Sequence, residues 1–326
     1  MTGWPMLVFG RAAWALLIER FAGYPMPLFD RISHPVVWIG RLIDWLDKQL
    51  NIRGVSPQEG RVRGALAVAS LMVAVFIPSY YLSRILTHWP YGWLAEALLA
   101  TTLIAQKSLK DHVVAVYDGL GRSLAEGRKK VSLIVGRDPA ELDEAGVAKA
   151  ALESLAENAS DGIVAPVLWY ALLGLPGIVM YKAINTADSM IGHKNVKYQW
   201  FGWAAARLDD LVNLPASRLT GFLFAAADPS RFGEIVQVMQ RDAPKHQSPN
   251  AGWPEAAMAA ALGVRFGGSR LYDGEMVELP YMGDGRDNIT RDDIQRGLRV
   301  LSRAMWLLFL GMLLVSLFVA AVDINP

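Results

Sequence analysis

The sequence predicts an all-α membrane protein: a polytopic helical bundle with broken or re-entrant helices and sizeable cytoplasmic helical loops. Of its 326 residues, 53% are hydrophobic, the mean hydropathy is +0.25, and the apolar residues are clustered rather than spread. A helix that crosses a bilayer needs about 20 consecutive apolar residues. Residues 65–82 and 304–322 provide such runs without an internal charge, and alternating β-branched runs are few. These observations favour membrane-spanning helices over a fold built on sheets.

Six segments are candidate spans, taken in chain order: 6–21, 65–82, 91–105, 163–181, 211–227 and 304–322. Arg11 and Glu19 interrupt the first of these segments, and Glu96 interrupts the third. Pro176 lies in the fourth segment and Pro215 lies in the fifth. Because proline disrupts a helix, we expect broken or re-entrant helices there, which membranes tolerate where irregular backbone lines a polar cavity.

Most of the Lys and Arg residues lie in three long connections between these segments: 22–64, 106–161 and 228–303. An excess of positive charge marks the cytoplasmic side of a membrane protein. We therefore expect these three connections to be cytoplasmic loops of a single membrane-embedded domain over residues 1–326.

Three local signals add detail to the loops. A short strand or hairpin is expected at residues 131–135 and around residues 270–279. Thr290 with Asp293 resembles a capping box that starts a helix leading into the last span. Asn250 lies just before an apolar helical run and is expected either to cap that helix or to touch a substrate, capping being the commoner use.

Composition excludes several classes of protein. The chain has no cysteine, so disulfides, thiolate metal sites, iron–sulfur clusters and cysteine nucleophiles are excluded. Its formal net charge is +1 and no basic run marks a soluble face, so nothing indicates nucleic-acid binding. Phosphate-binding, dinucleotide-binding, serine-hydrolase and zinc-protease motifs are also absent from the sequence.

Acidic side chains follow one another at helical spacing before the fourth candidate span. Glu153, Glu157 and Asp161 are spaced i, i+4 and i+8, which places them on one helix face. Like charges at that spacing repel unless a cation or a proton relieves them, and Lys149 reaches only one end. A charge close to hydrocarbon is a functional candidate by default. A divalent-cation or substrate site is one reading, and a solvated helix face is the other.

Two further stretches combine carboxylates with side-chain amides at helical spacing: Asn185 and Asp188, then Asp209, Asp210 and Asn213. Arg207 lies three residues before Asp210, and Lys182 lies three residues before Asn185. Carboxylate and amide oxygens near phosphate-binding cations are typical of Mg²⁺ sites. An internal ion-pair network between helices is the structural alternative.

Single residues near these stretches are weaker candidates. His193 is the histidine inside the cluster, and a lone histidine is more often structural than catalytic. Arg137, before Asp138-Pro139, is a candidate for phosphate binding or for an ordinary turn. The other histidines show no metal-ligand spacing: His34, His88, His112 and His246.

Several long strings resemble the CobD/CbiB family of cobalamin-biosynthesis membrane proteins. They are HPVVWIGRLI (34–43), VGRDPAELD (135–143), ESLAENASDGIVAPVLW (153–169), the stretch from YKAINTADSM to SRLT (181–220), and SPNAGWPEAAMAAALGVRFGG (248–268). The resemblance covers most of the chain. One departure lies at Gly23-Tyr24-Pro25, where the family usually has an acidic residue followed by Gly-Asp-Pro.

The resemblance implies adenosylcobinamide-phosphate synthase activity in the bacterial inner membrane, with the active site facing the cytoplasm. Such a ligase joins a propionate carboxylate of adenosylcobyric acid to the amine of (R)-1-amino-2-propanol O-2-phosphate, with ATP and Mg²⁺. It works in the lipid bilayer, and association with other corrinoid-pathway enzymes is expected.

Amide formation sets the roles that we expect of the candidate residues. The carboxylate must be activated, most simply as an acyl phosphate, and the amine must be neutral when it attacks. Residues expected to hold Mg²⁺ or polarise the amine are Glu157, Asn158, Asp161, Asp188, Asp209 and Asp210. One of these carboxylates, with Glu157, Asp161, Asp188 and Asp210 as the catalytic candidates, would take the ammonium proton. Candidates for contacting phosphates and substrate are Arg137, Lys182, Asn185, His193, Arg207 and Asn250.

Two other functions are compatible with the same residues. The acidic motifs around Asp188 and Asp209 are similar to those of membrane prenyltransferases, which bind a diphosphate through Mg²⁺. Broken spans with charge near the membrane also suit a transporter or sensor that binds a corrinoid without transforming it.

Overall fold

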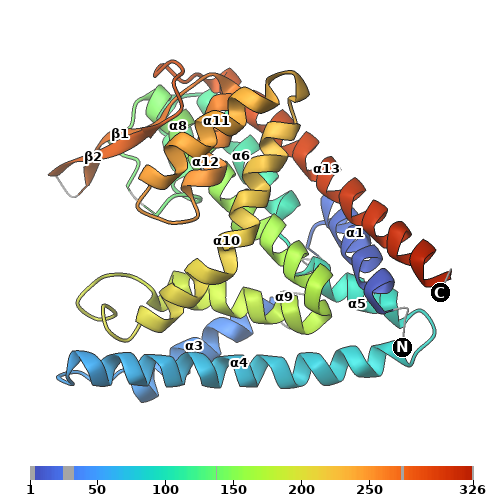
Figure 1. Cartoon of the computed structure of the whole chain (residues 1–326). Helices are drawn as coiled ribbons and strands as arrows, with labels where there is room; N and C mark the ends of the chain where they lie inside the picture. Colours follow the sequence, from blue (N-terminus) through green and yellow to red (C-terminus); the bar gives the residue numbers. More distant parts are fainter. Residues whose placement is uncertain (1–3, 25–32, 137, 273–274, 325–326) are drawn as a thin grey trace. The chain divides into compact units, whose positions relative to one another are not determined.

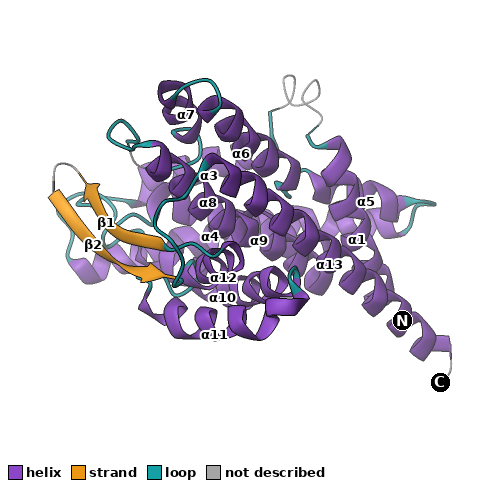
Figure 2. Ribbon diagram, turned by 90° about the horizontal axis from the view of Figure 1, so that it is seen from above, coloured by secondary structure: helices purple, strands orange, loops and turns teal. Residues whose placement is uncertain are grey.

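A computed structural model of the chain describes residues 4–24, 33–136, 138–272 and 275–324. Within these residues the elements are helices apart from one antiparallel hairpin (Figures 1 and 2), which confirms the all-α prediction. The chain divides into two compact units, and each is described by itself. The first unit comprises residues 1–105, 165–213 and 311–326, and the second comprises residues 106–164 and 214–310.

The first unit is built from α1 (Trp4–Ala22), α3 (Pro35–Leu50), α4 (Pro57–Thr87), α5 (Gly92–Thr101) and α9 (Ala165–Ile191). Helix α9 packs against α1, α3 and α4. Its core joins Ile39 and Ile43 of α3, Leu71 of α4, and Ala187 and Ile191 of α9. The spacing of four within α3 and within α9 puts these apolar side chains on one face of each helix. The neighbouring face of α9 is left for polar residues.

Helix α9 is broken, as expected for the fourth candidate span, whereas α10 (Trp203–Ala226) continues through Pro215 as one helix, so the break expected in the fifth span is wrong. Gly174 has non-helical backbone angles (φ 67°, ψ −156°) that suit glycine, and Pro176 follows it two residues later. A π-helical segment, Ser160–Val164, precedes α9. The break and the π segment both lie in or beside residues 163–181.

Three stretches in the described part of the chain are long and apolar enough to cross a membrane: Pro57–Thr87, Glu144–Ile191 and Arg291–Val322. They contain the expected spans 65–82, 163–181 and 304–322. The other expected spans, 6–21, 91–105 and 211–227, coincide with α1, α5 and the second part of α10 (Trp203–Ala226), and their crossing stays a prediction. The chain is a helical membrane protein.

The charges that interrupt the first and third expected spans are paired with each other. Nη1 of Arg11 lies 3.1 Å from Oε2 of Glu96, and these side chains are 5% and 1% exposed. The hydroxyl of Ser83 donates to the same oxygen at 2.9 Å. The hydroxyl of Tyr170 donates to Oε1 of Glu96 at 3.4 Å. A buried charge is tolerated when it is paired and hydrogen-bonded, so this cluster holds helices α1, α4, α5 and α9 together.

The second unit contains α6 (Gln106–Leu120), α7 (Leu124–Val131), α8 (Glu144–Ala159), two 3₁₀ turns (Pro229–Arg231 and Ala243–Lys245), α11 (Phe232–Asp242), α12 (Gly252–Leu262), β1 (Phe266–Tyr272) and β2 (Glu275–Met282). Helix α8 packs against α6, α7 and α12. The hairpin expected at 270–279 is confirmed by β1 and β2. The strand expected at 131–135 is wrong, because α7 reaches Val131 and a turn follows.

The capping box is confirmed at the start of α13 (Arg291–Ile324), which runs through both units. The backbone N–H of Thr290 donates to Oδ2 of Asp293 at 2.8 Å, and the Thr290 hydroxyl donates to the same atom at 3.0 Å. Asp293 is also paired with Arg286 and Arg296. The Asp293 carboxylate thus accepts a hydrogen bond at the start of the helix and also pairs with two cations.

Candidate active site

The connection between α9 and α10 brings two polar stretches of the first unit together. The backbone N–H of Gly192 donates to the carbonyl of Asp188 at 2.8 Å, where α9 ends. A Cβ on Gly192 would lie 2.0 Å from Oδ1 of Asp188, so only glycine leaves room for that carboxylate. A Cβ on Gly202 would lie 1.7 Å from the carbonyl oxygen of Ile191. The two glycines therefore allow the chain to return close to the end of α9 before α10 begins.

Asp209 of α10 lies at the centre of the resulting cluster and is 9% exposed. Its Oδ2 accepts a hydrogen bond from Nδ2 of Asn213 at 2.9 Å, and its Oδ1 accepts one from Nδ2 of Asn185 at 3.5 Å. The hydroxyl of Tyr181 donates to Oδ1 of Asn213 at 2.8 Å. Tyr181 thereby fixes the orientation of the Asn213 amide, and the two helices are joined through one carboxylate and two amides.

The acidic side chains of this cluster interact electrostatically. Burial, and then the carboxylate of Asp188, raise the pKa of Asp209 to about 7, although the hydrogen bonds from the two amides favour its charged form. Burial also raises the pKa of Asp210, while Arg207 and Lys194 oppose that rise. A carboxyl group whose pKa lies near neutrality can both hold and release a proton. Asp209 therefore has the properties of a proton acceptor.

Two cationic side chains contact members of this cluster. Nζ of Lys182 donates to Oδ1 of Asn185 at 3.4 Å. Nη1 of Arg207, an exposed residue, lies 3.7 Å from Oδ2 of Asp210. The structure thus brings two of the three acidic stretches together and combines carboxylates, amide groups and cations there.

His34 lies within electrostatic reach of Lys182, one of the predicted site residues. Burial, and then the charge of Lys182, lower the pKa of His34. Nδ1 accepts a hydrogen bond from the backbone N–H of Val36 at 3.2 Å, which caps α3 and leaves the ring proton on Nε2. Tyr24, where the chain departs from the usual Gly-Asp-Pro, lies edge-on with ring centroids 4.9 Å apart. The spacing of His34 matches no metal-ligand pattern, and only folding brings it near Lys182.

A family model described as "CobD/Cbib protein" matches residues 12–301. The chain belongs to the CobD/CbiB family. It is 49% identical over 298 residues to the cobalamin biosynthesis protein CobD of Sinorhizobium fredii, covering 89% of this chain and 91% of that protein. It is 50% identical over 293 residues to the protein of the same name from Rhodobacter capsulatus, covering 89% and 92%. The corresponding protein of Brucella suis is 46% identical over 316 residues, covering 94% and 97%. No solved structure matches the chain.

The site of this CobD/CbiB chain falls inside the strings that carry the resemblance. The longest string, residues 181–220, contains both polar stretches around Asp188 and Asp209. Another string begins with His34. Membership of that string is the feature of the sequence that draws attention to His34, because its spacing from other histidines does not.

The third acidic stretch of the CobD/CbiB chain belongs to the second unit, and its members differ in environment. Glu153 is 7% exposed, and its Oε1 accepts a hydrogen bond from the backbone N–H of Gly267 at 3.0 Å. Nζ of Lys149 donates to the carbonyl of the same glycine at 3.2 Å. Glu157 is exposed, and Asp161 is half-buried in the π segment. Glu153 therefore anchors the start of the hairpin, while the functional roles of the other two stay predictions.

The remaining predicted residues have varied settings: Asn158, His193, Asn250 and Arg137. Nδ2 of Asn158 donates to the carbonyl of Ser154 at 2.9 Å. His193 is exposed, within electrostatic reach of Asp188. Arg137 lies outside the described residues.

The capping role expected of Asn250 is wrong. Helix α12 begins at Gly252 with Ala251 as its N-cap and no side-chain cap. Oδ1 of Asn250 instead accepts hydrogen bonds from the Ser217 hydroxyl at 3.1 Å and from Nη1 of Arg218 at 3.0 Å. The side chain turns toward α10 because the half-buried guanidinium of Arg218 and the buried hydroxyl of Ser217 offer it two donors there.

The donor set of the site suits Mg²⁺ with its phosphates rather than a metal held by protein alone. In the described residues, no group of three or more His, Asp or Glu side chains is arranged to hold a metal ion. Mg²⁺ is usually bound by one or two carboxylates together with substrate phosphates and water. Burial, and then repulsion from Asp188, raise the pKa of Asp209, and a divalent cation bound there would relieve that repulsion.

Proposed function

We propose that this chain acts in cobalamin biosynthesis as an adenosylcobinamide-phosphate synthase. The reaction joins a propionate carboxylate of adenosylcobyric acid to the amine of (R)-1-amino-2-propanol O-2-phosphate through a new amide bond. Family membership and the names of the relatives support the pathway. The single observation that carries the proposal is the buried Asp209, held by two amides beside Asp188 and bounded by cations.

The chemistry requires activation of a carboxylate and deprotonation of an amine. ATP supplies the phosphoryl group that activates the carboxylate, most simply as an acyl phosphate, and Mg²⁺ neutralises phosphate charge. The C–N bond forms as the bond from the acyl carbon to the phosphate oxygen breaks, and phosphate leaves. One proton must leave the ammonium group before the attack. A base with a pKa near 7 suits this transfer because it is partly free at neutral pH.

The residues of the first unit divide between these tasks. Asp209 takes the proton from the ammonium group. Asp188 and Asp210 would hold Mg²⁺, and the cations Lys182 and Arg207 would face the phosphates. The amide of Asn185 aligns Asp209 with Lys182 because it hydrogen-bonds to both.

Residues of the second unit keep the roles predicted for them. Glu157, Asn158 and Asp161 are proposed to serve Mg²⁺ or the amine, and Asn250 the substrate. Substitution of each by alanine tests these roles through the turnover of the purified protein.

We propose the bacterial inner membrane as the location, with the site on the cytoplasmic side, where ATP and the corrinoid are available. The membrane helices and the positive loops support this orientation. Association with other corrinoid-pathway enzymes is part of the proposal. Single cysteines at Ser189 and Ser269 of this cysteine-free chain test the orientation. Both should react with a membrane-impermeant maleimide from the cytoplasmic side, and periplasmic labelling of the cysteine at 189 contradicts it.

Turnover by the purified protein in lipid nanodiscs tests the activity. Adenosylcobyric acid, the aminopropanol phosphate, ATP and Mg²⁺ should give the amide product by mass spectrometry, and omission of either ATP or the amine should abolish it. Consumption of a prenyl diphosphate with release of diphosphate supports the prenyltransferase alternative instead. Corrinoid binding without any product supports a transporter or sensor.

A further inference from the structure

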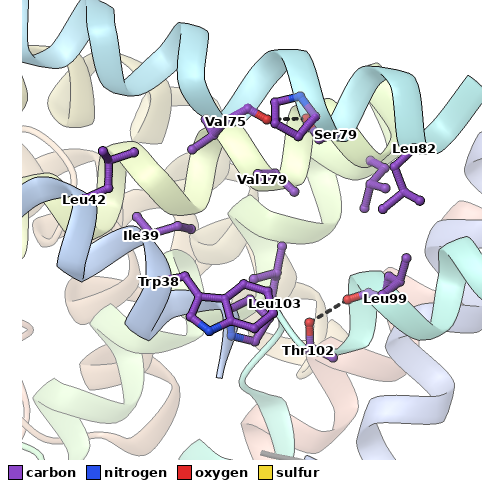
Figure 3. Close-up of a pocket in the computed structure, with 13 residues that line it drawn as sticks. Trp38, Ile39, Leu42, Val75, Ser79, Leu82, Leu99, Thr102, Leu103 and Val179 are labelled. Atoms are coloured by element: carbon purple, nitrogen blue, oxygen red, sulfur yellow. Dashed lines mark hydrogen bonds between the residues drawn. The ribbon is translucent and has the colours of Figure 1, made fainter. Parts of the chain in front are cut away.

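The first unit contains a partly open cavity of about 330 Å³ that the ligase chemistry does not use. It lies among α3, α4, α5 and α9, with lining side chains that include Leu42, Val75, Leu103 and Val179 (Figure 3). Ligand pockets in proteins begin at about 300 Å³, so the cavity is large enough for a ligand. The chemical character of the lining side chains determines which kind of ligand fits.

The wall offers almost no hydrogen bonds to a ligand. The two hydroxyls that line the cavity are those of Ser79 and Thr102. The Ser79 hydroxyl donates to the carbonyl of Val75 at 2.7 Å, and the Thr102 hydroxyl donates to the carbonyl of Leu99 at 2.7 Å. Both hydrogens are therefore used inside their own helices, as Figure 3 shows. A polar ligand would lose its hydration there without compensation, which excludes the corrinoid side chains and phosphates.

The rim of the cavity continues into an exposed apolar surface of the candidate membrane helix α4. Trp38, Leu82 and Leu99 line the cavity and keep 48%, 40% and 41% of their surface exposed. Helix α4, which supplies part of the wall, is one of the candidate spans and exposes Val73 and Ile77 beside it. Hydrocarbon is therefore the medium at the opening, and Trp38 has the amphipathic ring that is typical of the interface.

We infer that this cavity binds an acyl chain of a membrane phospholipid. A straight hydrocarbon chain matches an apolar wall without free donors, and it enters from a rim that already contacts lipid. An empty cavity of this size would leave its lining atoms without dispersion partners. The occupant is thus a lipid of the bilayer, distinct from the substrates of the ligase reaction.

Native mass spectrometry of the full-length protein tests the inference. The detergent-purified protein is mixed with 1-palmitoyl-2-oleoyl phosphatidylethanolamine, and phospholipid retained per chain is measured after collisional removal of the micelle. Wild-type protein should retain one phospholipid, and Val179→Trp, which fills the cavity, should lower that retention by roughly tenfold or more. Val73→Trp, on the exposed face of α4 outside the cavity, should retain it as the wild type does.

A second filling variant keeps the test decisive. Leu99→Trp fills the same cavity from the exposed rim, so it is the substitution more easily accommodated if Val179→Trp does not fold. Loss of the retained phospholipid in this variant, with retention in Val73→Trp, supports the acyl-chain site. The inference is overturned if wild-type protein retains no phospholipid, if the filled variants retain as much as wild type, or if an isoprenoid displaces the phospholipid in competition.

Discussion

Asp209→Asn should remove a pH-dependent loss of stability. The pKa of Asp209 is raised from 3.8 to about 7 in the folded protein by burial and by Asp188. Between those values the folded chain keeps a proton that the unfolded chain has released. The free energy of unfolding therefore falls as the pH rises through this window, and the stability conferred by the neutral carboxyl is fully present only below pH 3.8. Asparagine is neutral at every pH, so the variant does not have this pH dependence of the free energy of unfolding.

The size of the effect follows from the width of the window. One pKa unit corresponds to about 1.4 kcal/mol, so the 1.5 units between pH 5.5 and 7 represent a loss of about 2 kcal/mol for wild-type protein. At about 2.1 cal/mol/K per residue, a chain of this length shifts its Tm by roughly 1.5 °C per kcal/mol, so the Tm of the variant relative to that of wild type should rise by about 3 °C between pH 5.5 and pH 8. Thermal unfolding in detergent, followed by tryptophan fluorescence, measures it. Equal pH slopes for both proteins would refute the reasoning.

Asp210→Asn is the matched control for this experiment. Asp210 is half-buried, and Arg207 and Lys194 oppose the rise of its pKa. Its replacement should therefore change the pH slope less than Asp209→Asn does. Addition of Mg²⁺ at pH 8 should stabilise wild-type protein more than Asp209→Asn, because the cation relieves the repulsion among the carboxylates. Equal stabilisation of the two proteins would argue against Mg²⁺ binding beside Asp209, at Asp188 and Asp210.

Two further predictions concern the packing of the first unit. Arg11→Ala should lower the free energy of unfolding by about 3–5 kcal/mol, since Glu96 is left buried without its cation, and Arg11→Leu combined with Glu96→Leu should restore most of it in the same thermal assay. A single variant that is as stable as wild type would contradict a paired buried charge. Gly192→Ala should lower turnover by roughly 100-fold, because a Cβ would displace the Asp188 carboxylate, whereas Gly233→Ala, whose Cβ meets no atom within 4 Å, should not. Equal turnover by these two variants would show that the position of the Asp188 carboxylate does not matter for turnover.

Local rules anticipated the local parts of the fold. Pro176 predicted a broken helix, and the break lies at Gly174, two residues before it. Thr290 and Asp293 predicted the start of α13, because a capping box involves only neighbours in sequence. The stretch 131–135 was misread because its apolar, β-branched residues follow the strong helix formers of α7, which extend the helix to Val131.

Sequence patterns could not predict contacts between residues that lie far apart in the chain. Arg11 and Glu96, seen as interruptions of two spans, are 85 residues apart and form one ion pair. Glu153 was grouped with Glu157 by spacing, yet tertiary contact makes it the partner of Gly267, 114 residues away. Spacing of side chains indicates which of them share a helix face, and the packing of other elements decides which of those meet a ligand.

The turnover of Asp188→Asn tests the central claim most directly, because this change keeps the size of the side chain and removes its charge. Wild-type protein and Ser189→Ala, an exposed neighbour on α9, should convert adenosylcobyric acid to the amide product at equal rates in nanodiscs with ATP and Mg²⁺. Asp188→Asn should lose at least about 100-fold in turnover while its thermal unfolding stays intact. Wild-type turnover by Asp188→Asn would contradict a catalytic cluster at the end of α9 and the start of α10.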